Sequence, residues 1–109
     1  MGELAGGRAA EVVIDTQLDP TGARLITVSG ELDSSNVASL EATIASVTAE
    51  RPERLIFDLS GLRFMDSAGI SALIGAAGKV NAVQLRDPSQ AVRRVIELTG
   101  LTGVLPMGP

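Results

Sequence analysis

Hydrophobic residues gather in two neighbouring stretches near the start of the chain, residues 12–18 and 23–29. Both stretches have the length and the β-branched content of strands. The sequence between them is DPTG, and these are residue types that tight turns prefer. The pattern therefore predicts a β-hairpin at the start of the fold.

Apolar residues at helical spacing follow the hairpin. The residues that share this predicted helical face are Val37, Leu40, Ile44 and Val47. The polar residues 34–36 directly before them are of types that cap helix N-termini. We expect the helix to end before Pro52, because proline cannot continue it.

A short apolar strand is predicted at residues 54–59, and a connecting loop at residues 60–65. The loop carries two large apolar side chains, Phe64 and Met65. We expect both side chains to be buried beneath the loop, since large apolar residues are most often buried. The alternative is that they form an exposed binding patch.

A second helix is predicted to begin at Ser67, because apolar residues recur at helical spacing after it. Its apolar face consists of Ile70, Leu73, Ile74 and Ala77. Gly75 and Gly78 each weaken a helix interior by about 1 kcal/mol relative to alanine. We therefore expect the helix to be short and to end near Gly78.

The last third of the chain predicts one more strand and one more helix. Residues 82–86 form the strand, and Pro88 and Ser89 precede the helix. Its inner face is expected to contain Val92, Val95, Ile96 and Thr99. Gly100 should end it, and residues 104–105 are expected to add a final strand edge.

Strands that alternate with helices predict an α/β fold. We expect a single domain at residues 11–106, with a mixed β-sheet that starts with the hairpin and has helices packed against it. Residues 1–10 are rich in Gly and Ala and should form a flexible lead-in, and residues 107–109 a short tail.

Composition narrows the possible functions. The chain has 109 residues, a formal net charge of −4 and neither Trp nor Tyr. The basic surface and stacking aromatic residues that nucleic-acid binding requires are therefore not expected. Because no apolar run is long enough to cross a bilayer and no secretory signal is evident, we expect a cytoplasmic protein.

Histidine and cysteine are absent from the sequence, which excludes Ser-His-Asp and Cys-His catalysis and thiolate or imidazole metal sites. Residues 75–80 (GAAGKV) do not match the phosphate-binding loop of nucleoside triphosphatases, because the spacing is too short and Val80 replaces the required Ser or Thr. We expect a protein that is not an enzyme and has no cofactor.

Ser67 is the main candidate for a functional residue. It follows the predicted strand and loop at residues 54–65, and it places a hydroxyl at the start of the predicted helix. Helix N-termini favour anions, and the exposed N–H groups of Ala68 and Gly69 would stabilise a phosphate there. On spacing alone, however, a structural role for Ser67 as the helix N-cap is the favoured interpretation.

Two neighbours of Ser67 also allow two interpretations each. Asp66 places a favourable negative charge at the helix N-terminus, or it orients Ser67. Gly69 provides room for an approaching partner loop, or it packs closely against the adjacent strand. The sequence leaves these alternatives open.

Four segments, in this order, resemble the STAS domain of the bacterial anti-sigma factor antagonist type. They are GELD at 30–33, LIFDLS at 55–60, FMDSAG at 64–69 and AVRRVIELTGL at 91–101. The similarity covers residues 12–105. In antagonists of this type, the serine after the Asp of the third segment is phosphorylated by the partner, and Ser67 holds that place.

The resemblance implies an anti-sigma factor antagonist. Such a protein binds an anti-sigma factor of the serine-kinase type and thereby releases a sigma factor, and phosphorylation of Ser67 would switch it off. It would act as a monomer or weak homodimer, without direct contact with nucleic acid or membrane. The residues expected to contact the partner are Asp33, Asp66, Ser67, Ala68, Gly69 and Ser71.

Two other functions remain open for a domain of this kind. It could be a scaffold subunit of a stress-sensing or transporter-associated complex. It could also be a sensor that binds a nucleotide or lipid in a groove beside Ser67.

Overall fold

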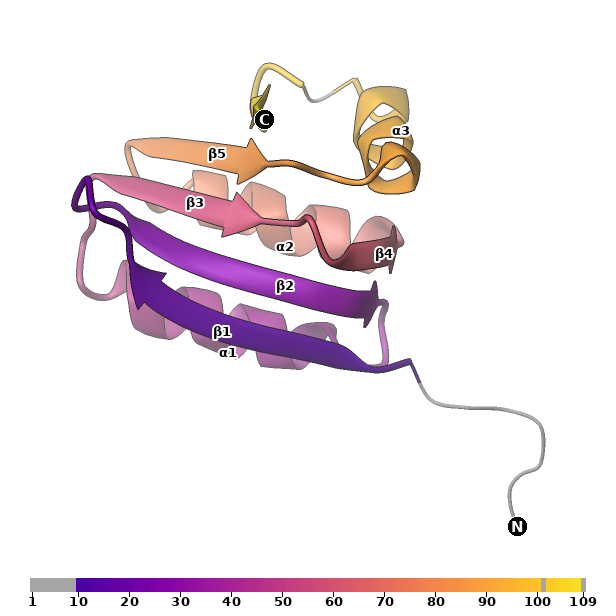
Figure 1. Cartoon of the computed structure of the whole chain (residues 1–109), viewed down its shortest axis with the longest axis horizontal. Helices are drawn as coiled ribbons and strands as arrows, with labels where there is room; N and C mark the ends of the chain where they lie inside the picture. The colour runs from indigo at the N-terminus through magenta and orange to yellow at the C-terminus, as the bar shows by residue number, and fades with distance from the viewer. Residues whose placement is uncertain (1–9, 101, 109) are drawn as a thin grey trace, which may run out of the picture.

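The computed structural model describes residues 10–100 and 102–108, which form a mixed β-sheet with three helices (Figure 1). The elements are β1 (Val12–Leu18), β2 (Arg24–Leu32), α1 (Val37–Thr48), β3 (Arg54–Asp58), β4 (Leu62–Met65), α2 (Ser67–Ala77), β5 (Ala82–Arg86), α3 (Gln90–Leu98) and β6 (Met107–Gly108). The predicted α/β fold with an N-terminal hairpin is confirmed. Residues 1–9 of the predicted lead-in at 1–10, together with Leu101 and Pro109, lie outside the described residues.

The sheet has the strand order β1-β2-β3-β5-β6, and β4 pairs with the far end of β2. Only β1 runs antiparallel to its neighbour, since every other pair is parallel. All the strands from β2 onward therefore have their carboxyl ends at the same edge of the sheet. This edge is where open α/β folds place their sites.

β4 was not predicted, because residues 60–65 were expected to form only a loop. In the structure β2 continues to Leu32, three residues beyond its predicted end, and its last residues pair with β4. The register shifts after Gly30, whose φ is +98°, and a β-carbon there would lie 2.2 Å from the Glu11 carbonyl oxygen. Glycine is therefore required at this bend.

Helices α1 and α2 both lie on one face of the sheet, behind it in Figure 1. The predicted inner residues of α1 face the core: Leu40, Ile44 and Val47 are buried, and Val37 is half-buried. α2 ends at Ala77 with Gly78 as its C-cap, as predicted. Each fully buried Leu, Ile or Phe contributes about 1.5–3 kcal/mol to folding relative to an exposed one.

The C-terminal part differs from the prediction in two places. Thr99, expected on the inner face of α3, is exposed as the C-cap, although Val92 and Ile96 are buried. The last strand is Met107–Gly108 rather than residues 104–105, because Leu105 turns into the core and is fully buried. The sheet thus extends into residues that were expected to form a tail.

Candidate functional site

Ser67 is the first residue of α2 and is exposed. Asp66 alone separates it from β4, and the Asp66 N–H donates to the Leu32 carbonyl at 3.3 Å. These contacts fix the start of α2 to the carboxyl ends of β2 and β4. The Ser67 hydroxyl is exposed and makes no hydrogen bond within the described part of the chain.

The N-cap of α2 is Asp66 rather than Ser67. Oδ1 of Asp66 accepts a hydrogen bond from the Ala68 N–H at 2.9 Å, and the backbone of Asp66 is extended. The N-cap interpretation of Ser67 is therefore wrong by one residue. A cap of this kind stabilises a helix by about 1 kcal/mol, and the structural role assigned to Ser67 belongs to Asp66.

The backbone donors at the start of α2 are largely occupied. The Ala68 N–H bonds to the Asp66 carboxylate, and the Gly69 N–H donates to the Asp66 carbonyl at 3.1 Å. The expectation that these two N–H groups are free for an anion is wrong in this state. An anion on Ser67 would meet the positive end of the helix dipole and, beside it, the Asp66 carboxylate.

Gly69 is buried against the strands that precede the site. A β-carbon at this position would lie 2.4 Å from Met65 Cγ and 2.9 Å from Leu32 Cδ2. Such distances are shorter than any ordinary van der Waals contact, so the packing interpretation of Gly69 has direct structural support. Ala68 is half-buried, and Ser71, one turn after Ser67, is exposed.

Phe64 and Met65 point in different directions, because successive side chains of a strand lie on opposite faces. Met65 is only 1% exposed, as predicted. Phe64 is 49% exposed, so the expectation that it is buried is wrong. The other phenylalanine of the chain, Phe57, is fully buried. Phe64 therefore places the one exposed aromatic side chain three residues before Ser67.

Asp33 lies in the turn that follows β2. Its Oδ1 accepts hydrogen bonds from the Ser35 hydroxyl at 2.6 Å and the Ser35 N–H at 2.8 Å. These bonds stabilise the charged carboxylate, and they hold the pKa of Asp33 below its ordinary value. Because Leu32 pairs with Met65, this turn lies at the same edge of the sheet as Asp66 and Ser67.

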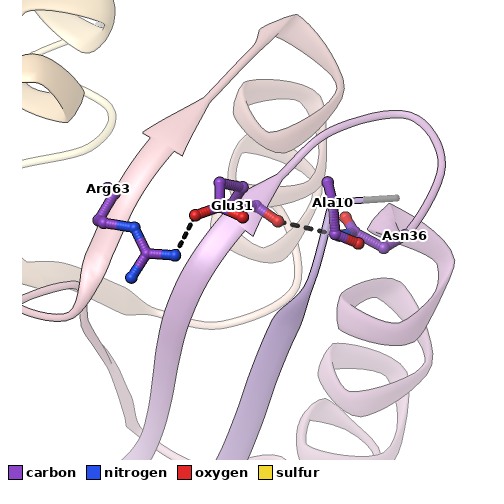
Figure 2. A network of polar contacts seen from close by, with 4 residues as sticks. All are labelled: Ala10, Glu31, Asn36 and Arg63. Atoms are coloured by element: carbon purple, nitrogen blue, oxygen red, sulfur yellow. Dashed lines mark hydrogen bonds and ion pairs between the residues drawn. The ribbon is translucent and has the colours of Figure 1, made fainter. Parts of the chain in front are cut away.

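Asn36 holds this edge together without capping α1 (Figure 2). Its Nδ2 donates to the carbonyls of Glu31 at 2.9 Å and Ala10 at 3.2 Å, and its Oδ1 accepts from the Asp33 N–H at 3.0 Å. Glu31 also forms an ion pair with Arg63, its neighbour on β4. The sequence indicated Asn36 only as a capping residue, and it gave no signal for the Glu31–Arg63 pair.

The sequence model of the STAS domain family matches residues 14–109. The chain belongs to the STAS domain family. The resemblance drawn from four short segments is therefore confirmed over most of the chain. In this STAS domain, the third segment forms the end of β4 and the start of α2, where Asp66 and Ser67 lie.

Several relatives of this STAS domain are anti-sigma factor antagonists by name. The anti-sigma-F factor antagonist RsfB of Mycobacterium tuberculosis is 32% identical over 96 residues, which are 85% of this chain and 79% of RsfB. An anti-sigma F factor antagonist of Lysinibacillus sphaericus is 34% identical over 82 residues, which are 71% of this chain and 70% of that protein. The similarity thus extends through the fold and through the site.

The crystal structure of an anti-sigma factor antagonist from Mycobacterium paratuberculosis has the same architecture. It superimposes with a TM-score of 0.84 at 31% identity and covers 91% of this chain and 86% of that one. The arrangement of sheet and helices that positions Ser67 is therefore shared with a solved member of the family.

Metal-binding groups and membrane-spanning helices were also sought among the described residues. Among residues 10–100 and 102–108, no three acidic side chains come together in a group that could hold a metal ion. No helix in that part of the chain is long and apolar enough to cross a membrane. What this edge of the sheet presents is the exposed Ser67 hydroxyl together with the half-buried carboxylates of Asp33 and Asp66.

Proposed function

We propose that this STAS domain is an anti-sigma factor antagonist that acts in the cytoplasm. It binds an anti-sigma factor of the serine-kinase type, releases a sigma factor, and is switched off when its partner phosphorylates Ser67 with Mg-ATP. The domain is then a substrate rather than an enzyme. The observation that carries the proposal is the exposed, unbonded Ser67 hydroxyl at the start of α2, in a chain whose relatives are named antagonists.

The electrostatics of the site explain how such a switch would act. A phosphoryl group adds about −1.5 to −2 charges at neutral pH. In the free protein, solvent surrounds Ser67 and the dipole of α2 partly compensates this charge. In a closed interface the phosphate loses water next to the Asp66 carboxylate, and repulsion adds to the cost of desolvation. Phosphorylation therefore opposes the complex more than it opposes the fold.

The partner surface we propose is the edge at the carboxyl ends of β2 and β4. It combines the Asp33 turn with Asp66, Ser67 and the exposed Ser71 on α2. Asp66, Ser67 and Ser71 all lie in the first turns of α2 or directly before it. A kinase that must hold Ser67 against the γ-phosphate of ATP could contact all three.

Two experiments test the proposal in sequence. Tagged wild-type protein and the S67D variant are used as baits in a lysate of the host, and the retained proteins are identified by mass spectrometry. We expect an anti-sigma factor that only the wild-type bait retains. The purified anti-sigma factor is then incubated with Mg-ATP and either the wild type or S67A, and mass spectrometry should place one phosphate on Ser67 and none on S67A.

Two other results would contradict all or part of this proposal. If both baits retain the same STAS proteins or transporter subunits, the domain is a scaffold. If a retained anti-sigma factor phosphorylates another residue, or none, the antagonist role survives without the Ser67 switch.

A further inference from the structure

A pocket of about 260 Å³ lies beside β5, at the edge of the sheet opposite Ser67. Arg54 and Ala82, which line it, are the first residues of β3 and β5 and are paired with each other. The parallel strands place their amino ends here and their carboxyl ends near Ser67, as the strand arrows in Figure 1 show. The pocket is thus separate from the proposed partner surface.

The pocket exists because β6 is short. β6 pairs only with Leu85 and Arg86, so the first three residues of β5 have no strand on that side. Most of the lining is apolar and comes from Ala82, Val83, Pro106 and Met107. The volume lies slightly below the roughly 300–1,000 Å³ of typical ligand sites, which indicates a small occupant with an apolar body.

Two polar side chains in the lining have unused donors. The half-buried Gln84 amide makes no hydrogen bond within the described residues. It lies next to Gly108, where a β-carbon would come within 2.7 Å of its Nε2. Arg54 donates to the Thr21 hydroxyl at 3.2 Å, and no carboxylate of the described chain lies within 4.0 Å of it.

The side chains of Arg54 and Gln84 determine which charge a ligand of this pocket should carry. Arginine presents a fork of N–H donors that matches a carboxylate or a phosphate. Arg54 has no carboxylate within 4.0 Å, but its charge also acts on the more distant Asp19 carboxylate. One guanidinium that is already partly compensated, in a chain whose net charge is −4, favours a monoanion over a dianion. The Gln84 amide can add one neutral donor to the same group.

We propose that this pocket, defined by Arg54, Gln84 and the apolar residues around them, binds a small organic acid with one carboxylate and an apolar body. The carboxylate lies on the Arg54 guanidinium and the Gln84 amide, and the apolar body covers Val83, Pro106 and Met107.

The test is a titration of the ¹⁵N-labelled full chain with benzoate at neutral pH, followed by amide NMR. We expect saturable shifts at Val83, Gln84 and Gly108. Benzamide has the same shape without the charge, and it should bind about tenfold more weakly or worse. R54Q should weaken benzoate binding by a similar factor of about ten, whereas R63Q, at the other edge of the sheet, should leave it unchanged.

Equal binding of benzoate and benzamide would overturn the proposal, as would equal binding of benzoate by R54Q. Shifts that rise without saturation, or that gather around Ser67, would overturn it as well. Arg54 is exposed, so R54Q should keep a folded spectrum. Q84L provides a second variant, which should also weaken benzoate and leave benzamide less affected.

Discussion

A β-carbon on Gly69 would lie 2.4 Å from Cγ of Met65, so the first turn of α2 rests directly on the end of β4. The contact couples the backbone next to Ser67 to the core. Gly75, in the same helix, would meet nothing within 4 Å if it carried a β-carbon, and its φ is not positive. The two glycines therefore differ in what they do for the fold.

We expect G69A and G75A to change stability in opposite directions. Overpacking at residue 69 costs about 1–3 kcal/mol, and the gain in helix propensity, up to about 1 kcal/mol, offsets only part of it. At residue 75 only the gain remains. Urea unfolding should show a lower midpoint for G69A and a higher midpoint for G75A. A higher midpoint for both variants would show that the side chains of Met65 and Leu32 move aside for the added methyl group without a loss of stability.

The capping role of Asp66 predicts different effects for two substitutions. D66A removes the acceptor for the Ala68 N–H and should lower the free energy of unfolding by about 1 kcal/mol. D66N keeps a good capping side chain and should lose much less. Thermal unfolding of both variants at neutral pH measures the difference, with S67A as the control that leaves the cap in place. Equal losses for D66A and S67A would contradict the assignment of Asp66 as the N-cap.

The turn at Asp33 gives a pH dependence. Bonds from the Ser35 hydroxyl and then from the Ser35 N–H hold the pKa of Asp33 below its ordinary value. A lowered pKa in the folded state means that this group stabilises the protein above its ordinary pKa. The contribution is lost as the pH falls through the lowered value.

The S35A variant tests this pH dependence, because it removes the hydroxyl donor and leaves the N–H. We expect the pKa of Asp33, followed by NMR of its carboxyl carbon, to move back toward the ordinary range. The acid limb of the stability curve should move to higher pH. S34A, which removes a neighbouring exposed hydroxyl that makes no bond to Asp33, should leave both unchanged. An Asp33 titration identical in S35A and wild type would rule out Ser35 as the cause.

The sequence predicted the elements whose apolar residues repeat regularly. The buried face of α1 and the limits of β1 and β5 follow from the sequence pattern alone. In α1 and β5 the apolar residues are buried at regular intervals, and in β1 the half-buried Val12 and Ile14 alternate with exposed residues before the strand reaches its turn. β4 has four residues, and it pairs with β2 beyond the shift at Gly30. A strand that depends on a distant partner leaves little periodicity of its own, so its residues were expected to form a loop.

The same missing strand explains why part of the site was mispredicted. Without β4, nothing in the sequence indicated that Phe64 and Met65 lie on opposite faces. Asp66 and Ser67 are both good capping residue types, so composition could not decide between them. The choice depends on backbone geometry at one residue, and Asp66 is the one whose backbone is extended before the helix begins.

Exposure of Phe64 predicts a role in binding rather than in stability. Large aromatic side chains are frequent among the residues that dominate the free energy of protein–protein binding, and Phe64 lies beside the edge that we propose for the partner. F64S should weaken binding of the anti-sigma factor by at least about tenfold. Because half of the side chain is already in water, the free energy of unfolding should fall by less than about 1.5 kcal/mol.

Calorimetric titration with the purified anti-sigma factor measures the binding, and urea unfolding of the same samples measures the stability. The matched control is L98S, which replaces an apolar side chain that is 81% exposed near the end of α3. It should leave the affinity unchanged, because α3 contributes none of the proposed contacts. If L98S weakens binding as much as F64S, the partner surface extends over α3. If F64S binds as tightly as wild type, Phe64 is an exposed residue without a role in recognition.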